Sequence, residues 1–471
     1  MVNYVLELTK QRSEIEQIFT WLWVTAALSL SLLYLISPDG YFTFIVTSGG
    51  MLVVAALSLA YPSVLLYFIL ATSVFSSILR NADSVTVGST TVSLSGLRWI
   101  WVGAIVIAVL AINFRRVQFK GPYYWLLIFS GWVMLRWMGT PSGIGLRDVL
   151  FYSLPVLLAV YTSFLLATTS SDLIGRTRWL LLCTAAIPAI AYAILIPAGL
   201  VTLEDIGPEG IIDPRAISEY LLVVLCVAAS QWRYGATAKS RKHGLAISIL
   251  CLATTVLTLS RAATFVGMIL MGFAQANVWQ FRKIVFAVTT AAVFLTAVVW
   301  FVPTFRNRFT GQDGAFSEEF PYINTEGRAF FWAVTIEHAI EKPVIGWGPG
   351  SARLLVGAAI PDSEYEEYHP HNEYLQVFHD LGLVGLVLML LGWVPLLRVH
   401  WRRWRASDAL GDNMAAQWHM SALLALAVVL LSSTVGNTLH EAYITAPTLI
   451  LSACAFSYAR SMQTHARQGS A

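Results

Sequence analysis

Apolar runs of about 20 residues recur along almost the whole chain, and no other feature limits its possible folds as strongly. A helix of this length crosses the roughly 30 Å hydrocarbon core of a bilayer. The chain has 471 residues, of which 57% are hydrophobic and only 12% are charged. Its mean hydropathy is +0.66, whereas soluble domains carry about 25% charged residues. The sequence therefore predicts an all-α polytopic integral membrane protein.

The number of spans depends on how closely spaced runs are divided. Runs 41–60 and 62–79, for example, are separated only by Tyr61-Pro62, so hydropathy allows either 12 or 14 spans. The candidate spans are 17–36, 41–60, 62–79, 97–114, 122–139, 148–169, 178–200, 214–232, 243–260, 262–278, 281–302, 374–398, 417–435 and 441–460.

Basic residues indicate the orientation. When the spans alternate, most lysines and arginines, including Arg115, Arg116, Arg402, Arg403 and Arg405, fall in the loops on one side. That side is expected to be the cytoplasm, because basic residues in short loops resist translocation. Both termini are then cytoplasmic, the span count is even, and the first span is expected to be an uncleaved anchor. The net charge of +3 reflects this asymmetry, so we expect no nucleic-acid partner.

One connection is far longer than the others. We divide the chain into an N-terminal bundle of transmembrane helices (1–302), a loop domain on the outer side (303–373), C-terminal transmembrane helices (374–460) and a cytoplasmic tail (461–471). The loop domain contains the helical pattern GRAFFWAVTIEHAI (327–340) and the turn GWGPG (346–350). Its aromatic residues and turns favour an ordered cap at the membrane surface over a disordered insertion.

Several arginines lie near the outer ends of spans, against the general charge bias. Arg215 opens a span in DPRAISEY, and Arg261 joins two spans in TLSRAA. A charge at membrane depth costs about 2.5–3.5 kcal/mol on insertion scales and commonly marks a ligand path. The planar guanidinium group suits phosphate oxygens, so converging arginines would hold a diphosphate. The alternative for each single residue is an arginine that reaches the lipid headgroups.

The segment HPHNEYLQVFHDLGLVG (369–385) places a polar cluster where the long loop returns to the membrane. A histidine at this rim can take a proton from a sugar hydroxyl, so His371 is the candidate base. If the helix begins near Pro370, His371 aligns with Tyr374 along it. Asn372, Tyr374 and His369 are candidate substrate-binding residues. The alternative is a histidine that caps the helix or meets headgroups.

A metal site is the other interpretation of this cluster. It would use His369, His371, Glu367 and Glu373, but their spacing does not match a strong ligand pattern. We therefore predict no metal and no cofactor.

His371-Asn372, nine further residues and then Gly382-Leu383-Val384-Gly385 together resemble the motif H-[NSQ]-x9-G-x-x-[GTY] of bacterial O-antigen ligases (WaaL). The segment GRAFFWAVTIEHAIEKPVIGWGPG is similar to the loop of the wider O-antigen ligase and polymerase superfamily. TLSRAA and the arginine that opens a span at Arg215 are looser similarities. The resemblance covers roughly residues 120–400.

The resemblance implies twelve transmembrane helices in the bacterial inner membrane, both termini in the cytoplasm and a periplasmic loop at the active site. It implies transfer of O-antigen polysaccharide from undecaprenyl diphosphate, a membrane lipid, to lipid A–core by a metal-independent inverting glycosyltransferase. His371 would be the general base. Arg215 and Arg261 would bind the donor diphosphate, with Arg328 as a third candidate.

Three alternatives remain open at this point. An O-antigen polymerase shares the fold and uses another lipid-linked chain as acceptor, and a protein O-oligosaccharyltransferase uses a protein. A lipid-linked glycan transporter would be expected to show broken helices or charged residues at mid-bilayer. The sequence also leaves open which carboxylate tunes His371, the candidates being Glu219, Glu326, Glu337 and Asp380.

Overall fold

The computed structural model describes residues 61–78, 84–87, 90–117, 121–168, 172–195, 214–258, 260–275, 328–360 and 367–468, with isolated positions near 54–58 and 289–293. The candidate spans at 17–36 and 281–302, and nearly all of 41–60, lie outside these residues. The whole-chain span count and the four-part division of the chain therefore stay predictions.

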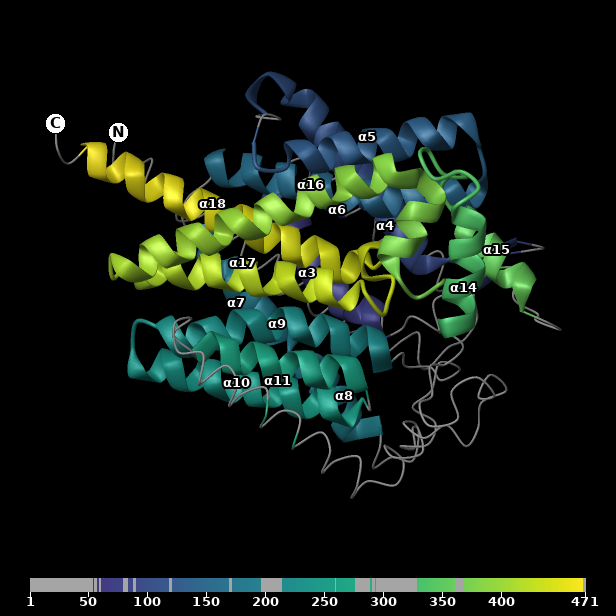
Figure 1. Ribbon diagram of the computed structural model, residues 1–471. Coiled ribbons are helices and arrows are strands. Elements are labelled where there is room, and N and C mark those ends of the chain that lie inside the picture. Colours follow the sequence, from purple (N-terminus) through teal and green to yellow (C-terminus); the bar gives the residue numbers. More distant parts are fainter. Residues whose placement is uncertain are drawn as a thin grey trace.

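The described chain is a helical bundle with one short β-hairpin (Figure 1). Its first helices are α3 (Pro62–Ile78), α4 (Leu94–Ile112), α5 (Tyr124–Gly139), α6 (Gly143–Thr168), α7 (Asp172–Thr184), α8 (Ala186–Leu195), α9 (Pro214–Tyr234), α10 (Ala238–Leu257) and α11 (Arg261–Gln275). The later helices are α14 (Arg328–Ala339), α15 (Ser351–Ala359), α16 (Glu373–Ala409), α17 (Asn413–Ser432) and α18 (Ala442–Gln468). The short elements are β1 (Ser84–Val87), β2 (Thr90–Ser93), η1 (Phe114–Arg116) and η2 (Thr438–His440).

Most of these helices coincide with the predicted spans, which confirms a helical membrane protein. Five helical segments in the described residues are long and apolar enough to cross a membrane, namely 143–167, 173–194, 373–409, 413–432 and 442–459. Three shorter apolar helices, 63–74, 98–112 and 262–275, add to them. The β1–β2 antiparallel hairpin was not predicted from the sequence.

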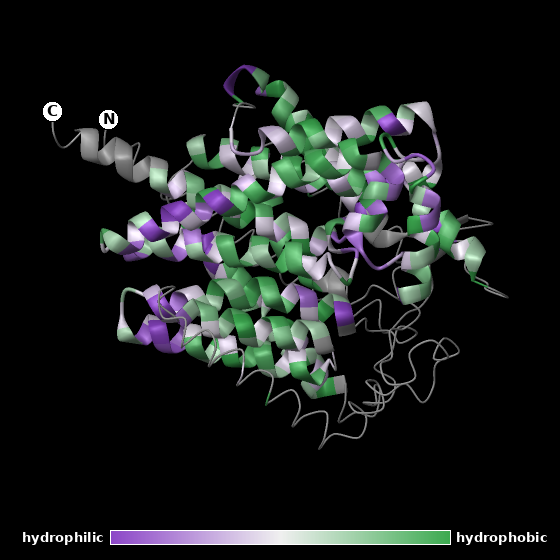
Figure 2. Cartoon of the chain, viewed as in Figure 1, coloured by the Kyte–Doolittle hydropathy of each residue, from purple (hydrophilic) through white to green (hydrophobic). Residues whose placement is uncertain are grey.

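Hydropathy is distributed as a bilayer requires. Apolar residues dominate the middle of the helices, and polar residues gather at the two ends of the bundle (Figure 2). Large apolar side chains such as Ile107, Leu135, Ile194 and Val394 are exposed by 47% or more on the helix surfaces. In water such a surface would be a liability; towards lipid it is the expected exterior.

The long helices pack side by side, with α16 against α5 and α17, α18 against α6 and α17, and α9 against α10 and α17. Helices α14 and α15 lie together at one end of the bundle (Figure 1). We call this end, with residues 328–360, 367–372 and 436–441, the cap end, and the other the opposite end. The cap end carries the polar cluster that the sequence singled out.

Helix α16 starts and bends at positions that its sequence specifies. Asn372 is the N-cap residue, and its side chain accepts a hydrogen bond from the backbone N–H of Leu375 at 3.0 Å. Gly382 has φ 70° and ψ −172°, so it interrupts the helix about two and a half turns after its start at Glu373. Only glycine adopts this backbone conformation without strain.

The interruption at Gly382 is filled by the GWGPG turn. The backbone N–H groups of Trp347 and Gly348 donate to the carbonyls of His379 and Asp380, at 3.0 and 2.8 Å. In return, Leu383 donates to the carbonyl of Pro343 at 2.8 Å. Backbone groups that the bend removes from the helix thus find partners inside the protein, as membrane depth requires.

The close approach explains the glycine of the motif. A Cβ atom on Gly382 would lie 2.2 Å from the carbonyl oxygen of Val344, far inside contact distance. The first glycine of G-x-x-G therefore serves to dock the cap on α16, and the short helical piece 373–381 carries the polar cluster beneath it.

Candidate active site

His371 lies just outside α16 in a strained conformation. Its φ of 55° makes it the one non-glycine residue with positive φ among those that the structure describes. Such strain persists only where the surroundings enforce it, and it is concentrated at functional sites. The expectation that the helix begins near Pro370 and contains His371 is wrong, because Asn372 caps the helix and Glu373 is its first residue.

Arg215 contacts His371 directly. Its Nη1 atom lies 3.2 Å from Nδ1 of the imidazole, although the two residues are 156 positions apart. Arginine keeps all its protons and can only donate, so Nδ1 accepts and the ring proton is on Nε2. The Nε atom of Arg215 donates to Glu219 one turn along α9, at 3.3 Å. Both partners are partly accessible: the side chain of Arg215 is 34% exposed, and His371 is half-buried.

Gly436 makes room for this arginine. A Cβ atom there would lie 2.3 Å from Nη2 of Arg215. The carbonyl of Gly436 also accepts from the backbone N–H of Glu373 at 3.1 Å. The turn between α17 and η2 therefore forms one wall of the site.

The loop that carries His371 is tethered on both sides of it. The indole of Trp332 donates to the carbonyl of Pro370 at 2.8 Å, and the backbone N–H of Tyr368 donates to the carbonyl of Arg353 at 3.0 Å. The Tyr368 ring packs edge-on against the His371 ring, with centroids 5.5 Å apart. Helices α14 and α15 thus hold the loop from the cap side.

The remaining predicted arginines open helices. Arg328 is the first residue of α14 and is half-buried. Trp332, one turn further on the same face, contacts the His371 loop, so the start of α14 lies beside the site. Arg261 is the first residue of α11, but its side chain lies outside the described part of the chain. Its place in the site stays a prediction.

The predicted polar neighbours of His371 have contacts within the protein. Asn372 caps α16, and the hydroxyl of Tyr374 donates to the carbonyl of Leu430 on α17 at 2.8 Å. Nδ1 of His369 lies 3.2 Å from Oε1 of Gln376. These contacts organise the start of α16, and substrate binding by the three residues stays a prediction.

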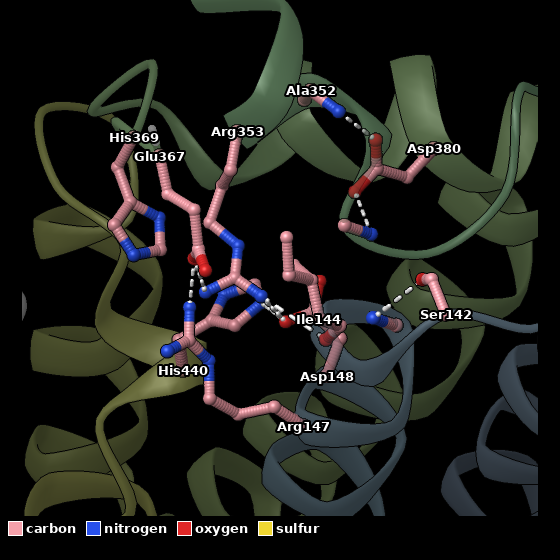
Figure 3. A network of polar contacts seen from close by, with 12 residues as sticks. Ser142, Ile144, Arg147, Asp148, Ala352, Arg353, Glu367, His369, Asp380 and His440 are labelled. Atoms are coloured by element: carbon pink, nitrogen blue, oxygen red, sulfur yellow. Dashed lines mark hydrogen bonds and ion pairs between the residues drawn. The ribbon is translucent and has the colours of Figure 1, made fainter. Parts of the chain in front are cut away.

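The candidate carboxylates are dispersed. Glu219 contacts Arg215, whereas Glu337 is exposed on α14 and Glu326 lies outside the described residues. Asp380 accepts from the backbone N–H groups of Gly350 and Ala352, at 2.9 and 2.7 Å, and so anchors the start of α15 (Figure 3).

One functional pair, a carboxylate and an imidazole next to the His371 loop, was not predicted from the sequence. Nδ1 of His440 lies 2.9 Å from Oε1 of Glu373, and Nε2 of His440 lies 3.4 Å from Oδ1 of Asp148. From the sequence alone, Glu373 is a candidate only for the alternative metal site. Glu373 follows His371 by two positions, but its partner comes from η2, on the far side of helices α16 and α17 in the sequence.

At the cap end, the surroundings shift the pKa values of His440 and His369 in opposite directions. Burial on its own lowers the pKa of His440, but Glu373 and Asp148 outweigh it and raise the pKa to about 10. Burial, and then the positive charges of Arg353 and His440, lower the pKa of His369 well below its usual value. At neutral pH His440 is therefore a cation and His369 a neutral ring.

No group of three or more His, Cys, Asp or Glu side chains within the described residues is arranged to hold a metal ion. The chemistry that the described groups offer is that of a half-buried imidazole beside fixed positive charge. Together with the bundle, they define a helical membrane protein with a polar site at one end of its spans.

Known proteins with similar sequences indicate which kind of helical membrane protein this is. Residues 246–390 match the family model described as O-antigen ligase. A Rickettsia conorii protein named "Putative polysaccharide ligase" is 30% identical over 168 residues, which is 32% of this chain and 38% of the relative. A Rickettsia felis protein of the same name is 26% identical over 165 residues, again 32% and 38%.

The matches thus span 38% of the length of these two relatives. The segment that matches the family model contains α14, α15, His371 and the G-x-x-G bend. This segment is similar to the O-antigen ligase family, which confirms the resemblance seen in the sequence.

Proposed function

We propose that the protein is a glycosyltransferase that moves O-antigen polysaccharide from undecaprenyl diphosphate to the outer-core sugar of lipid A–core. The site would face the periplasm of a bacterial inner membrane. The observation that carries this proposal is the 3.2 Å contact between Nδ1 of His371 and the guanidinium of Arg215. It brings a base and an anion-binding group together at one end of a membrane bundle.

The first step is donor binding. The diphosphate is a stronger partner for Arg215 than a neutral imidazole is, because it adds the attraction between opposite charges and can accept two parallel hydrogen bonds from the guanidinium group. Arg215 would therefore turn towards the diphosphate and release Nδ1 of His371. Arg328 and Arg261 are the candidates for further positive charge on the same group.

The second step is the transfer itself. Nδ1 of His371 takes the proton from the acceptor hydroxyl, and the hydroxyl oxygen attacks the anomeric carbon of the donor sugar from the face opposite the diphosphate. The bond from this carbon to the diphosphate oxygen breaks, and the diphosphate leaves with the electron pair. The arginines stabilise the negative charge that develops there, and the configuration at carbon is inverted.

The cap has a role in this scheme that follows from its attachment. Helices α14 and α15 are joined to the His371 loop by the Trp332 and Tyr368 contacts and to α16 by the bend at Gly382. A cap held in place by these contacts would orient the acceptor and limit the access of water to the reacting carbon.

A deletion strain complemented with variants tests the proposal. We expect the wild-type gene to restore long polysaccharide on lipid A–core and His371→Ala to leave it lipid-linked, with protein levels in the membrane unchanged. His400→Gln, which changes a buried histidine of α16 far from the site, is the matched control and should restore attachment. Normal attachment in the His371→Ala strain would contradict the mechanism.

The same strain separates the related functions. If single repeats, rather than none, are attached to lipid A–core in the deletion strain, the protein is a polymerase. If the polysaccharide is intact and periplasmic proteins lose glycans by mass spectrometry, the acceptor is a protein. Either result would replace the ligase assignment.

A further inference from the structure

Next to the loop that carries His371 lies a set of ionisable side chains that the transfer mechanism does not use. Figure 3 shows Arg147, Asp148, Arg353, Glu367 and His440 from this set. The whole set comes from α6, α15, the His371 loop, η2 and the first residue of α16. We call this set the charge chain; its members are Arg147, Asp148, Arg353, Glu367, Glu373 and His440.

One half of the charge chain joins the cap to α6. The guanidinium of Arg353, on α15, forms an ion pair with Asp148 and lies 3.5 Å from Oε2 of Glu367. Glu367 is also ion-paired with Arg147 on α6. Arg353 has a second contact with α6, since it donates to the carbonyl of Ile144 at 3.2 Å.

The other half joins α6 to α16. His440 lies between Asp148 and Glu373, at 3.4 and 2.9 Å. Glu373 in turn accepts a hydrogen bond from the hydroxyl of Tyr152 at 2.6 Å and one from the backbone N–H of Leu439 at 3.2 Å. When His440 is protonated, the charge chain contains three cations, Arg147, Arg353 and His440. They are matched by three anions, Asp148, Glu367 and Glu373.

The charge chain is deeply buried where it approaches His371. Arg353 is 1% exposed, Asp148 and Glu373 are 0% exposed and His440 is 3% exposed. Burying paired charges gives little net stability, and apolar residues of the same volume commonly do as well. Stability alone therefore gives no reason for placing six ionisable groups here.

The geometry supplies a reason. The charge chain holds both ends of the loop that carries His371: Glu367 at its start and Glu373 at its end. Inside the loop, His371 has a positive φ, which needs such restraint to persist. Gln376, which contacts His369 at 3.2 Å, also contacts His440 at 3.2 Å.

We propose that the charge chain is a positioning device for His371, in which the Glu373–His440 and Glu367–Arg353 pairs hold the strained loop and the charge of Glu373 supports the proton that His371 takes up. The proposal rests on the proposed function for the role of that proton. Glu373 and His440 are thus positioning residues and do not contact substrate.

The first measurement is the pKa of His371, and the second is the transfer activity. Diethylpyrocarbonate modifies neutral imidazoles, so peptide mass spectrometry of its reaction with purified protein across pH gives the pKa of His371. Among the described residues, the charged and titratable groups around His371 are Arg215 and Glu219 on α9, Arg328 on α14, Arg353 on α15, Tyr368 and His369 in the loop, Glu373 on α16 and His440 on η2.

Glu373→Gln is the main variant. It removes one negative charge near His371 and leaves His440 paired with Asp148, so we expect the pKa of His371 to fall by about one. The double variant Glu373→Gln/His440→Gln removes both charges and should return the pKa towards the wild-type value. His400→Gln, which removes a buried imidazole at the opposite end, should not move it.

Transfer assays with the same proteins give the second measurement. Glu373→Gln should lower kcat at least tenfold and change the KM for donor less than threefold, and the double variant should recover part of the loss. Should Glu373→Gln fail to insert, Glu367→Gln at the accessible end of the charge chain carries the test, with the same fall in kcat expected.

An unchanged His371 pKa in every variant, with kcat and stability falling together, would reduce the charge chain to a structural element and overturn the proposal. The labelling result does not depend on which sugars are transferred. If the pKa moves as expected while wild-type protein fails to join polysaccharide to lipid A–core, the proposed function fails and the positioning role stands.

Discussion

Both ends of the bundle bury histidines, but the surroundings of the two sets differ. At the cap end His440 lies between Glu373 and Asp148, next to a loop with strained backbone. At the opposite end Nδ1 of His400 lies 3.0 Å from Nδ1 of His419, and Nε2 of His400 lies 2.8 Å from the hydroxyl of Ser452. A hydrogen bond between two ring nitrogens needs one acceptor, so at least one of the two rings is neutral.

The two ends of the bundle show that a buried histidine does not by itself indicate a functional site. Buried imidazoles at the opposite end join α16, α17 and α18 through neutral hydrogen bonds, which is a packing role. At the cap end, burial comes with opposite charges, a positive φ and an arginine that reaches an accessible imidazole. The combination, rather than any single feature, marks the site, and matched substitutions at the two ends can test the difference.

The largest expected difference concerns arginines. Arg215 faces His371, whereas Arg178 at the opposite end donates to Oε1 of Gln417 at 3.2 Å. Removing one group that stabilises developing charge costs about 10²–10³ in rate, so Arg215→Ala should lower polysaccharide transfer about a hundredfold. Arg215→Lys keeps the charge and should retain more activity.

Arg178→Ala is the control and should change the transfer rate less than about threefold, because Arg178 lies at the opposite end and does not contact the site. The hydrogen bond that is lost contributes only about 1 kcal/mol to the stability of the fold. The rates are measured with purified proteins and saturating acceptor. Equal losses in Arg215→Ala and Arg178→Ala would remove the distinction between the two ends.

The second difference concerns glycines with positive φ. Gly382 has φ 70° and a backbone carbonyl 2.2 Å from the position of a Cβ, whereas Gly411 has φ 71° and nothing within 4 Å. Both alanine variants incur backbone strain of about 1–3 kcal/mol, but only Gly382→Ala must also displace the GWGPG turn. We expect Gly382→Ala to lower the melting temperature in detergent by roughly twice as much as Gly411→Ala.

Gly382→Ala should also lower transfer, because the bend holds the cap on the helix that carries the site. Similar melting temperatures and full activity in both variants would show that the docking of the cap on α16 has no energetic importance.

The smallest difference concerns pH. The folded-state pKa of His440 is about 10, against an ordinary value near 6.5 in the unfolded chain. The folded state therefore binds the proton more tightly, and the stabilisation is fully present below about pH 6.5 and is lost as pH rises through about 10. Between pH 7 and pH 10 the wild type should lose a few degrees of melting temperature more than His440→Gln does.

His400→Gln serves as the reference, and its melting temperature should fall with pH as steeply as that of the wild type. Parallel curves for the wild type and His440→Gln would show that His440 is not a buried cation in the folded protein.

The sequence was informative wherever local pattern decides structure. Runs of about 20 apolar residues form helices such as α9 and α17 close to the expected bounds. The H-N-x9-G-x-x-G spacing singles out His371 and Gly382, although it does not predict the bend at Gly382. Arg215 could be nominated because a charge at a span end is costly and thus informative.

Long-range and strained features could not be predicted. The cap that the Asn372 side chain forms on α16, which places His371 outside the helix, is one such feature. The pairing of Glu373 with His440 depends on how α16 and η2 pack, and hydropathy does not encode that register. The β1–β2 hairpin was missed for a similar reason, since it is four residues long on each strand in a strongly apolar context.

A double-mutant cycle on His371 and Arg215, with transfer measured on purified protein, lipid-linked polysaccharide and lipid A–core in detergent, tests the account most directly. If the two side chains act as one site, His371→Ala alone abolishes transfer down to the background, and adding Arg215→Ala lowers the rate no further. Losses that multiply, or transfer that persists in the double variant, would contradict the claim that this imidazole and this guanidinium form the active site.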